Sequence, residues 1–311
     1  MDFKVTVLGT CSATFAWGRH QSATLVQFDN LHFLIDCGEG TQLQFIDHKV
    51  KTAKLEAIFI SHLHGDHYLG LVGLLGTMSM GGRKKPLTIY SPVGLKEIIE
   101  VQFKHSGTIL NYELNILEHQ ANSPEVIAQF QYFKVSTLPL QHRVPCTGYL
   151  FEETIAKRKF RSDRNLEVVP VPAIKAMKEG EDYDGPEGKY FAADWIEETR
   201  PPRKFAYCSD TIYLPHLADQ IKGVDLLYHE ATFDQEHIIR AKETFHSTAI
   251  EAATVAKDAG AGRLILSHFS SRFKELDVLV SEAKSVFPNA EAAVEGAEYP
   301  ILVNRTVTNT K

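Results

Sequence analysis

Three histidines and an aspartate stand close together in the segment SHLHGDH, which directly follows the apolar run Ala57–Ile60. The ligand-type residues of this segment are His62, His64, Asp66 and His67. Side chains two apart on an extended chain point to the same side, and Gly65 permits a turn that brings the later pair back. Imidazole nitrogens and a carboxylate oxygen are the ligands that zinc takes. A polar loop that is merely rich in histidine is the alternative, and the position after a buried strand argues against it.

Three further residues of ligand type come at, or just past, the end of an apolar run elsewhere in the chain. They are His142 after Tyr132–Leu138, Asp210 after Lys204–Cys208, and His268 at the end of Arg263–His268. Binding groups of layered α/β proteins gather at the carboxyl ends of strands. Taken singly, each of the three fits an ordinary surface or capping residue. Together with the SHLHGDH segment they supply enough ligands for two metal ions.

The elements that must position these residues alternate between short β-branched runs and helical stretches. Strands are predicted at Lys4–Leu8, Ala23–Phe28, His32–Asp36, Ala57–Ile60, Leu87–Tyr90, Tyr132–Leu138, Lys204–Cys208, Asp225–His229 and Arg263–His268. Helices are predicted at Thr41–His48, Tyr68–Met80, Pro92–His105, Ser247–Asp258 and Leu276–Phe287. Consecutive strands dominate the first part and strand–helix pairs the second, which favours a layered α/β fold over one doubly wound sheet.

The stretch 152–203 differs from its surroundings in having prolines, mixed charge and weak periodicity. It contains KRKFR at 157–161 and a proline pair at 201–202. We interpret it as an arm inserted within a single domain that spans residues 1–311, with a plain surface loop as the alternative. Candidate basic contacts for a nucleic acid are Arg83–Lys85, the run at 157–161, and Arg272 with Lys274.

Composition excludes several classes of protein. With 33 basic and 39 acidic residues the formal charge is −6, which disfavours non-specific coating of nucleic acid but permits a nuclease with a local basic surface. The four cysteines form no CxxC pair, as expected for reduced thiols in a cytoplasmic protein. The first residues lack the pattern of a signal peptide, and no apolar stretch is long enough to span a bilayer, so we expect no membrane association.

The order HxHxDH, lone His, lone Asp and final His resembles the metallo-β-lactamase superfamily. This resemblance implies a four-layer αββα sandwich with two Zn²⁺ per subunit at one edge of its two sheets. It assigns His62, His64 and His142 to one zinc ion. It assigns Asp66, His67 and His268 to the second, with Asp210 bridging the two.

Three further segments are similar to the ribonuclease Z family: DCGEGTQLQ at 36–44, HEATF at 229–233 and FHST at 245–248. The resemblance implies an endoribonuclease that removes the 3′ trailer of precursor tRNA, leaving a tRNA 3′-OH and a 5′-phosphate on the trailer. Asp66 would orient the attacking water, and His246, held by Glu230, would donate a proton to the leaving oxygen. The family also implies a homodimer in which the arm at 152–203 binds tRNA.

Three other functions compete with this interpretation. A phosphodiesterase of the same fold, acting on small or cyclic nucleotide diesters, would share every metal ligand. A lactamase- or glyoxalase-type hydrolase is disfavoured by the HEATF and FHST segments. A non-catalytic RNA-binding scaffold is disfavoured by the complete set of ligand-type residues.

Overall fold

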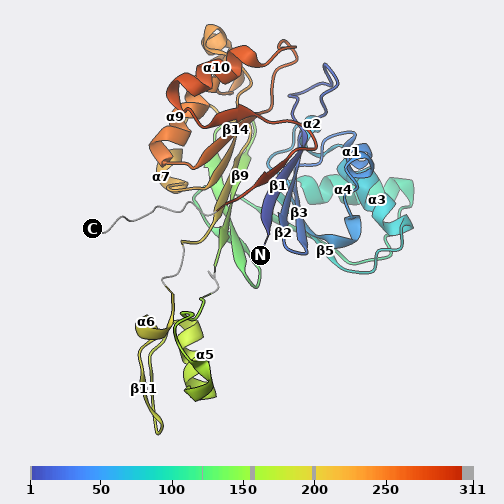
Figure 1. Cartoon of the computed structure of the whole chain (residues 1–311). Helices are drawn as coiled ribbons and strands as arrows, with labels where there is room; N and C mark the ends of the chain where they lie inside the picture. Colours follow the sequence, from blue (N-terminus) through green and yellow to red (C-terminus); the bar gives the residue numbers. More distant parts are fainter. Residues whose placement is uncertain (1, 121, 155–157, 198–200, 303–311) are drawn as a thin grey trace.

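Two seven-stranded sheets pack face to face in the computed structural model, which describes residues 2–120, 122–154, 158–197 and 201–302 (Figure 1). The first sheet has the order β16-β1-β2-β3-β4-β5-β6. Its strands are β1 (Phe3–Gly9), β2 (Ala23–Phe28), β3 (Leu31–Ile35), β4 (Leu55–Phe59), β5 (Leu87–Pro92), β6 (Leu114–His119) and β16 (Glu298–Pro300). From β3 to β6 the strands are parallel, so their carboxyl ends meet at one edge of the sheet.

The second sheet has the order β15-β14-β13-β12-β9-β8-β7. Its strands are β7 (Val126–Gln129), β8 (Phe133–Leu140), β9 (Cys146–Glu153), β12 (Lys204–Cys208), β13 (Leu226–Glu230), β14 (Arg263–Ser267) and β15 (Ala290–Ala292). The four strands β12 to β15 are parallel. Strand β13 is buried along its whole length, including His229 and Glu230 at its carboxyl end.

Helices cover the outer face of each sheet and complete four layers. The first sheet is covered by α1 (Thr41–Asp47), α3 (Leu71–Met80) and α4 (Leu95–Ser106), and the second by α7 (Leu217–Gln220), α9 (Ala249–Ala259) and α10 (Asp277–Val286). One apolar cluster lies between the two sheets, and one lies under each helical layer. The expected αββα sandwich is therefore confirmed. No helix in the described ranges has the length and apolar character needed to cross a membrane.

Local sequence explains where the principal covering helix begins and ends. Thr248 caps α9 in a reciprocal capping box with Glu251, and Gly260 ends the helix in a left-handed conformation. The alanines of α9 face the second sheet and allow the helix to approach it closely. The shorter helix α8 (Ile238–Thr244) and 3₁₀ turns at Thr52–Lys54, Leu166–Val168 and Gln235–His237 lie in the connections.

The predicted strands are present with small shifts at their ends, but two kinds of error occur. The single helix predicted at Tyr68–Met80 is wrong: α2 (Gly65–Tyr68) ends before α3 begins. The chain breaks there because Gly70 packs on the backbone at Cys37, where an added Cβ would lie 2.1 Å from the Gly38 carbonyl oxygen. Strands β6, β7 and β9 were not predicted, since exposed polar residues or a glycine interrupt their patterns, and four strands of only three residues each were not predicted either.

A small unit with its own apolar cluster lies between β9 and β12 and apart from the two sheets (Figure 1). It contains α5 (Val171–Glu179), the hairpin β10 (Tyr183–Gly185) and β11 (Gly188–Tyr190), and α6 (Ala192–Trp195). Lys157 of the KRKFR run lies outside the described residues. Where the unit joins the sheet, a carboxylate oxygen of Glu153 lies 2.8 Å from the Arg203 guanidinium, and both residues are buried.

Candidate metal centre

The SHLHGDH segment leaves the carboxyl end of β4 and turns directly into α2. His62 and His64 precede the helix, and Gly65 is its first residue, so Asp66 and His67 turn back toward the pair before them. The carboxyl ends of β12, β13 and β14 approach the same place from the second sheet. The site therefore lies where both sheets present the ends of their parallel strands.

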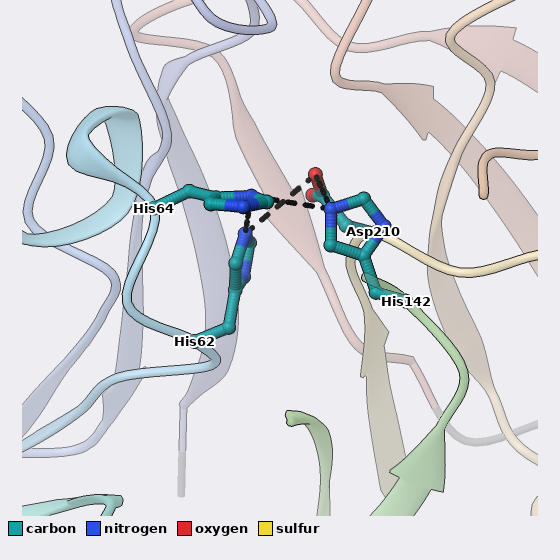
Figure 2. A group of neighbouring side chains, drawn as sticks. All are labelled: His62, His64, His142 and Asp210. Atoms are coloured by element: carbon teal, nitrogen blue, oxygen red, sulfur yellow. Dashed lines mark hydrogen bonds and ion pairs between the residues drawn. The ribbon is translucent and has the colours of Figure 1, made fainter. Parts of the chain in front are cut away.

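A first group of four side chains converges at this edge, as Figure 2 shows. Nδ1 of His64 lies 3.1 Å from Nε2 of His62 and 3.2 Å from Nε2 of His142. Oδ2 of Asp210 lies 3.7 Å from each of the latter two nitrogens. These four atoms come from both sheets and enclose one small space.

A second group lies beside the first and shares Asp210 with it. Nε2 of His67 lies 3.3 Å from Nε2 of His268, and these nitrogens lie 3.4 and 3.5 Å from Oδ2 of Asp66. Oδ1 of Asp210 lies 3.4 Å from His67 and 3.2 Å from His268. Each carboxylate oxygen of Asp210 thus faces a different group.

The spacing of these atoms fits metal ions of zinc's size. Four ligands at zinc's usual bond length of about 2.0–2.1 Å, placed at the corners of a tetrahedron, are about 3.3 Å apart. Both groups have neighbouring ligand atoms at 3.1–3.7 Å. The structure brings together all seven residues expected to bind metal, from segments distant in the chain, and their donor set suits a divalent cation.

Hydrogen bonds to the far side of the imidazole rings orient them toward the centre. Asp36, fully buried, accepts a hydrogen bond of 2.8 Å from Nδ1 of His67. Nδ1 of His142 donates to the Phe245 carbonyl oxygen at 2.9 Å. Because the other nitrogen carries the proton, Nε2 of each ring presents a lone pair to a metal.

The electrostatics of the cluster also favour bound cations. Burial is the main cause that lowers the pKa of His62, His64 and His142, which keeps these rings in the neutral form that binds metal. Burial lowers the pKa of His67 too, but the nearby carboxylates, Asp66 first among them, raise it well above its usual range. Excess negative charge at this position is what a divalent cation neutralises.

His246 lies beside the two groups and is held by Glu230. Its Nδ1 lies 2.9 Å from Oε1 of Glu230, which is fully buried and also accepts from the backbone amides of Thr211 and Thr232. Nδ1 lies farther, 3.9 Å, from Oδ2 of Asp210. Burial lowers the pKa of His246, but Glu230, Asp210 and Asp66 together outweigh this effect and raise the pKa to about 9.

Backbone strain accompanies the site. Asp36, Phe245 and His268 all have a positive φ between 57° and 60°, a conformation that few non-glycine residues adopt. Such strain collects where a fold must hold side chains in functional positions. Here each strained residue contributes a ligand-type group or the hydrogen bond that orients one.

Several residues of the site were not singled out from sequence, among them Asp36, Ser61, Tyr207 and Thr232. Three of the four lie in segments that were named from the sequence without a role for these residues: Asp36 in DCGEGTQLQ, Ser61 in SHLHGDH and Thr232 in HEATF. His229 of the HEATF segment is buried, with Nδ1 2.7 Å from the Glu230 carbonyl oxygen.

The chain is similar to known proteins over nearly its whole length. Residues 32–269 match the family model described as the beta-lactamase superfamily domain. Ribonuclease Z of Bacteroides fragilis (strain YCH46) is 41% identical over 296 residues, covering 94% of this chain and 97% of that protein. The chain belongs to the ribonuclease Z family. Ribonuclease Z of Cytophaga hutchinsonii is 43% identical, with 96% of both chains covered.

A solved structure agrees with this membership in the ribonuclease Z family. The crystal structure of human tRNase Z, short form, aligns with a TM-score of 0.71 and 28% identity, covering 96% of this chain and all of that one. Family membership makes the chain a metal-dependent hydrolytic nuclease. The family and the cluster of histidines and aspartates together indicate a divalent metal site at this edge of the two sheets.

One residue of the basic segments considered for RNA binding is buried: Arg83, whereas Lys84 and Lys85 beside it are exposed. Arg83 is 8% exposed, and its guanidinium donates to the carbonyl oxygens of Thr52, Leu55, Lys85 and Pro86. The prediction that Arg83 contacts a nucleic acid is wrong, because the side chain is already used to hold the connection before β5. Arg272 and Lys274 are exposed, beyond β14.

Proposed function

We propose that this protein removes the 3′ trailer from precursor tRNA as a zinc-dependent endoribonuclease, producing a tRNA 3′-OH and a trailer 5′-phosphate. The observation that carries the proposal is the centre just described, with Asp210 between two ligand groups and His246 on Glu230 beside them. The curated relatives named ribonuclease Z support the RNA substrate.

Two zinc ions per subunit fit the two groups. His62, His64 and His142 would hold one, and Asp66, His67 and His268 the other, with Asp210 shared. When bound, the two cations neutralise the phosphodiester and lower the pKa of a coordinated water to about 7. Oδ2 of Asp66 accepts the backbone N–H of Ala13 at 2.7 Å, which fixes the carboxylate that would orient the attacking water.

His246 is the proposed donor of the proton that the leaving 3′ oxygen needs. With Nδ1 bonded to Glu230, Nε2 is the atom that can deliver a proton. The raised pKa of this ring accords with a donor that is protonated at neutral pH. Glu230 positions the ring and compensates its positive charge.

We propose that the arm at 152–203 binds the tRNA. Within its described part, Arg158 and Arg161 line a hollow of about 420 Å³ together with residues of α6. Arg161 pairs with Asp163 at 3.5 Å in an exposed position, where a phosphate can compete for it. As in the family resemblance, we propose a homodimer in which one subunit's arm serves its partner, and a cytoplasmic location.

The decisive experiment is incubation of the purified protein with precursor tRNA lacking CCA, with and without a chelator. We expect one metal-dependent cut after the discriminator base. Cleavage of small chromogenic diesters without any cut of precursor tRNA would support the small-diester phosphodiesterase instead, which the relatives do not favour.

Substitution of His246 by Ala separates the roles within the centre. A proton donor contributes about 10²- to 10⁴-fold to the rate, so turnover should fall by that factor while metal content stays at two ions per chain. His246 also lies within reach of Asp210 and His268 as a possible ligand. Loss of a metal ion from the variant would show that His246 is a ligand and overturn its role as acid.

A further inference from the structure

The outer face of the first sheet carries a row of polar side chains away from the metal centre. Lys4 of β1, Gln27 of β2 and His32 of β3 occupy paired positions on three neighbouring strands. The carboxyl end of β3 leads to Asp36, which orients a ring of the centre, whereas His32 lies near the amino end of the same strand. Four residues separate the two, or about 13 Å along the strand. The row therefore belongs to the opposite edge of the sandwich.

A hollow of about 400 Å³, within the size range of ligand sites, lies over this row. The connection between α1 and β4 forms part of its lining and contributes Lys49, Lys51 and Lys54. Lys49 has a φ of 54° directly after the cap of α1, where glycine is the usual residue. The chain thus carries an ammonium group at this position at a cost in backbone strain.

Three carboxylates also line the hollow, those of Asp2, Asp29 and Glu298. Each already has a partner: Glu298 lies 2.6 Å and Asp2 3.9 Å from the Lys4 ammonium, and Oδ1 of Asp29 accepts the Asp2 backbone N–H at 2.7 Å. In the part of the chain that the structure describes, neither Lys49 nor Lys51 forms an ion pair. With four lysines against three carboxylates, the lining keeps a net positive charge.

His32 supplies a buried donor without an acceptor. It is 6% exposed, and its Nδ1 has no hydrogen-bond partner among the described residues. Oγ1 of Thr6 donates to Oε1 of Gln27 at 3.2 Å, so the Gln27 amide NH₂ faces Nε2 of His32 at 3.5 Å. Nε2 is then the acceptor, and Nδ1 carries the proton. Burial lowers the pKa of His32, and Lys54 and Lys4 lower it further, so the ring is neutral. Native structures rarely leave such an N–H unpaired, and a ligand is one source of the missing acceptor.

We propose that this hollow is a binding site for a phosphate-bearing anion, which accepts a hydrogen bond from Nδ1 of His32 and lies against the lysines of the connection after α1. Several ammonium groups around one donor suit phosphate, which has more negative charge and more acceptor oxygens than a carboxylate. Two sources share this chemistry, a free phosphorylated anion and a backbone phosphate of RNA. RNA is one of them because the start of β1 and the arm lie at the same end of the sandwich (Figure 1).

A site-resolved test is nitrogen NMR of the zinc-loaded protein labelled at histidine and titrated with inorganic phosphate. The signals of His32 are assigned by their loss in His32→Phe. We expect a saturable shift of the Nδ1 signal with a Kd of about 1 mM or tighter. His119, a buried histidine at the end of β6, should not respond, and the signals of the metal ligands report separately any phosphate at the centre.

A double variant, Lys49→Ala with Lys51→Ala, tests the charges and keeps His32 as the reporter. Both lysines are exposed, so their removal leaves the packing intact. An exposed charge contributes modestly, and the affinity for phosphate should fall by about 2- to 25-fold for the pair. Lys257→Ala with Lys284→Ala is the matched control, since it removes the same charge from exposed positions over the second sheet. Its affinity should stay within about 2-fold of the wild-type value.

Cleavage kinetics separate the two sources of the phosphate. If the double variant and His32→Phe both raise KM for precursor tRNA while the control variant does not, the phosphate is one of the RNA backbone. If phosphate shifts the His32 signal and KM is unchanged in both variants, the site takes a free anion. The site lies away from the metal centre, so kcat should be retained in every variant.

The inference is overturned if phosphate leaves the His32 signals unchanged and neither variant alters KM. Equal loss of phosphate affinity in the double variant and in its control would also overturn it, because the effect would then come from net charge alone. If the wild-type protein cuts no precursor tRNA, the proposed function fails, whereas the NMR titration still decides whether the hollow binds phosphate.

Discussion

Asp36 offers the sharpest test of how the fold prepares the metal centre. Its carboxylate is fully buried and accepts from the backbone N of Ser61 at 2.7 Å, from Oγ of Ser61 at 2.8 Å, from Tyr207 Oη at 2.8 Å and from His67 Nδ1 at 2.8 Å. Asp36→Asn is the appropriate change, because Asn has the same shape and tolerates the φ of 57° at this position.

The expected loss of zinc affinity in Asp36→Asn follows from the hydrogen bonds that this side chain makes. Oδ2 of Asp36 faces Oγ of Ser61, Oη of Tyr207 and Nδ1 of His67. An amide NH₂ in that place can donate to the two hydroxyl groups but not to an N–H. The His67 ring must then move its proton to Nε2, which faces Asp66, and loses the lone pair that binds metal. Loss of such an orienting partner weakens metal affinity by about 10- to 100-fold, or about 1.4–2.7 kcal/mol.

The assay is competition between the protein and a fluorescent zinc chelator, with cleavage measured at saturating and at limiting zinc. Tyr207→Phe is the matched control, since it removes one hydroxyl group and leaves both the carboxylate and the His67 hydrogen bond. We expect its zinc affinity to stay within about 3-fold of the wild-type value. The reasoning is refuted if Asp36→Asn binds zinc as tightly as the wild-type protein.

Three other predictions concern stability. Glu153→Ala removes the carboxylate beside the buried Arg203 guanidinium and should lower the free energy of unfolding by about 3–5 kcal/mol, measured by chemical denaturation. Asp184→Ala is the control: it breaks the exposed 2.6 Å pair with Lys189 and should lower the free energy of unfolding by no more than about 1 kcal/mol. Equal losses in the two variants would contradict this prediction. Burial lowers the pKa of His119 from 6.5 to about 4, so the folded state binds fewer protons than the unfolded chain between these values. The contribution of neutral His119 to the free energy of unfolding is present above pH 6.5 and falls by up to about 3 kcal/mol as the pH drops to 4. The His119→Leu variant should therefore lose less stability than the wild-type protein over this interval. If the free energy of unfolding falls equally with pH in both proteins, the claim is refuted. Chelation should lower the Tm by about 5–10 °C, with recovery on adding zinc, because the buried carboxylate of Asp210 loses its cation; an unchanged Tm would show that the centre needs none.

The sequence alone determined the residue types of the centre and most of the strands that carry them. The SHLHGDH segment, with His142, Asp210 and His268 at the ends of apolar runs, was recognisable because periodicity and short motifs are local properties. The αββα sandwich and the Glu230–His246 pair came from the family resemblance. The edge strands β6 and β7 were not predicted because, in half-exposed strands, apolar and polar residues alternate too weakly for the sequence to indicate a strand.

Only the tertiary structure decided which side chains support those ligands. Asp36 meets Tyr207 across 171 positions of the chain, and Thr10 meets Glu295 across 285. Arg83, which the sequence suggests is a basic surface residue, is buried because its guanidinium donates hydrogen bonds to carbonyl oxygens near the starts of β4 and β5. Hydrogen bonds of this kind depend on distances and directions between segments that are far apart in sequence, and these exist only once the two sheets have packed.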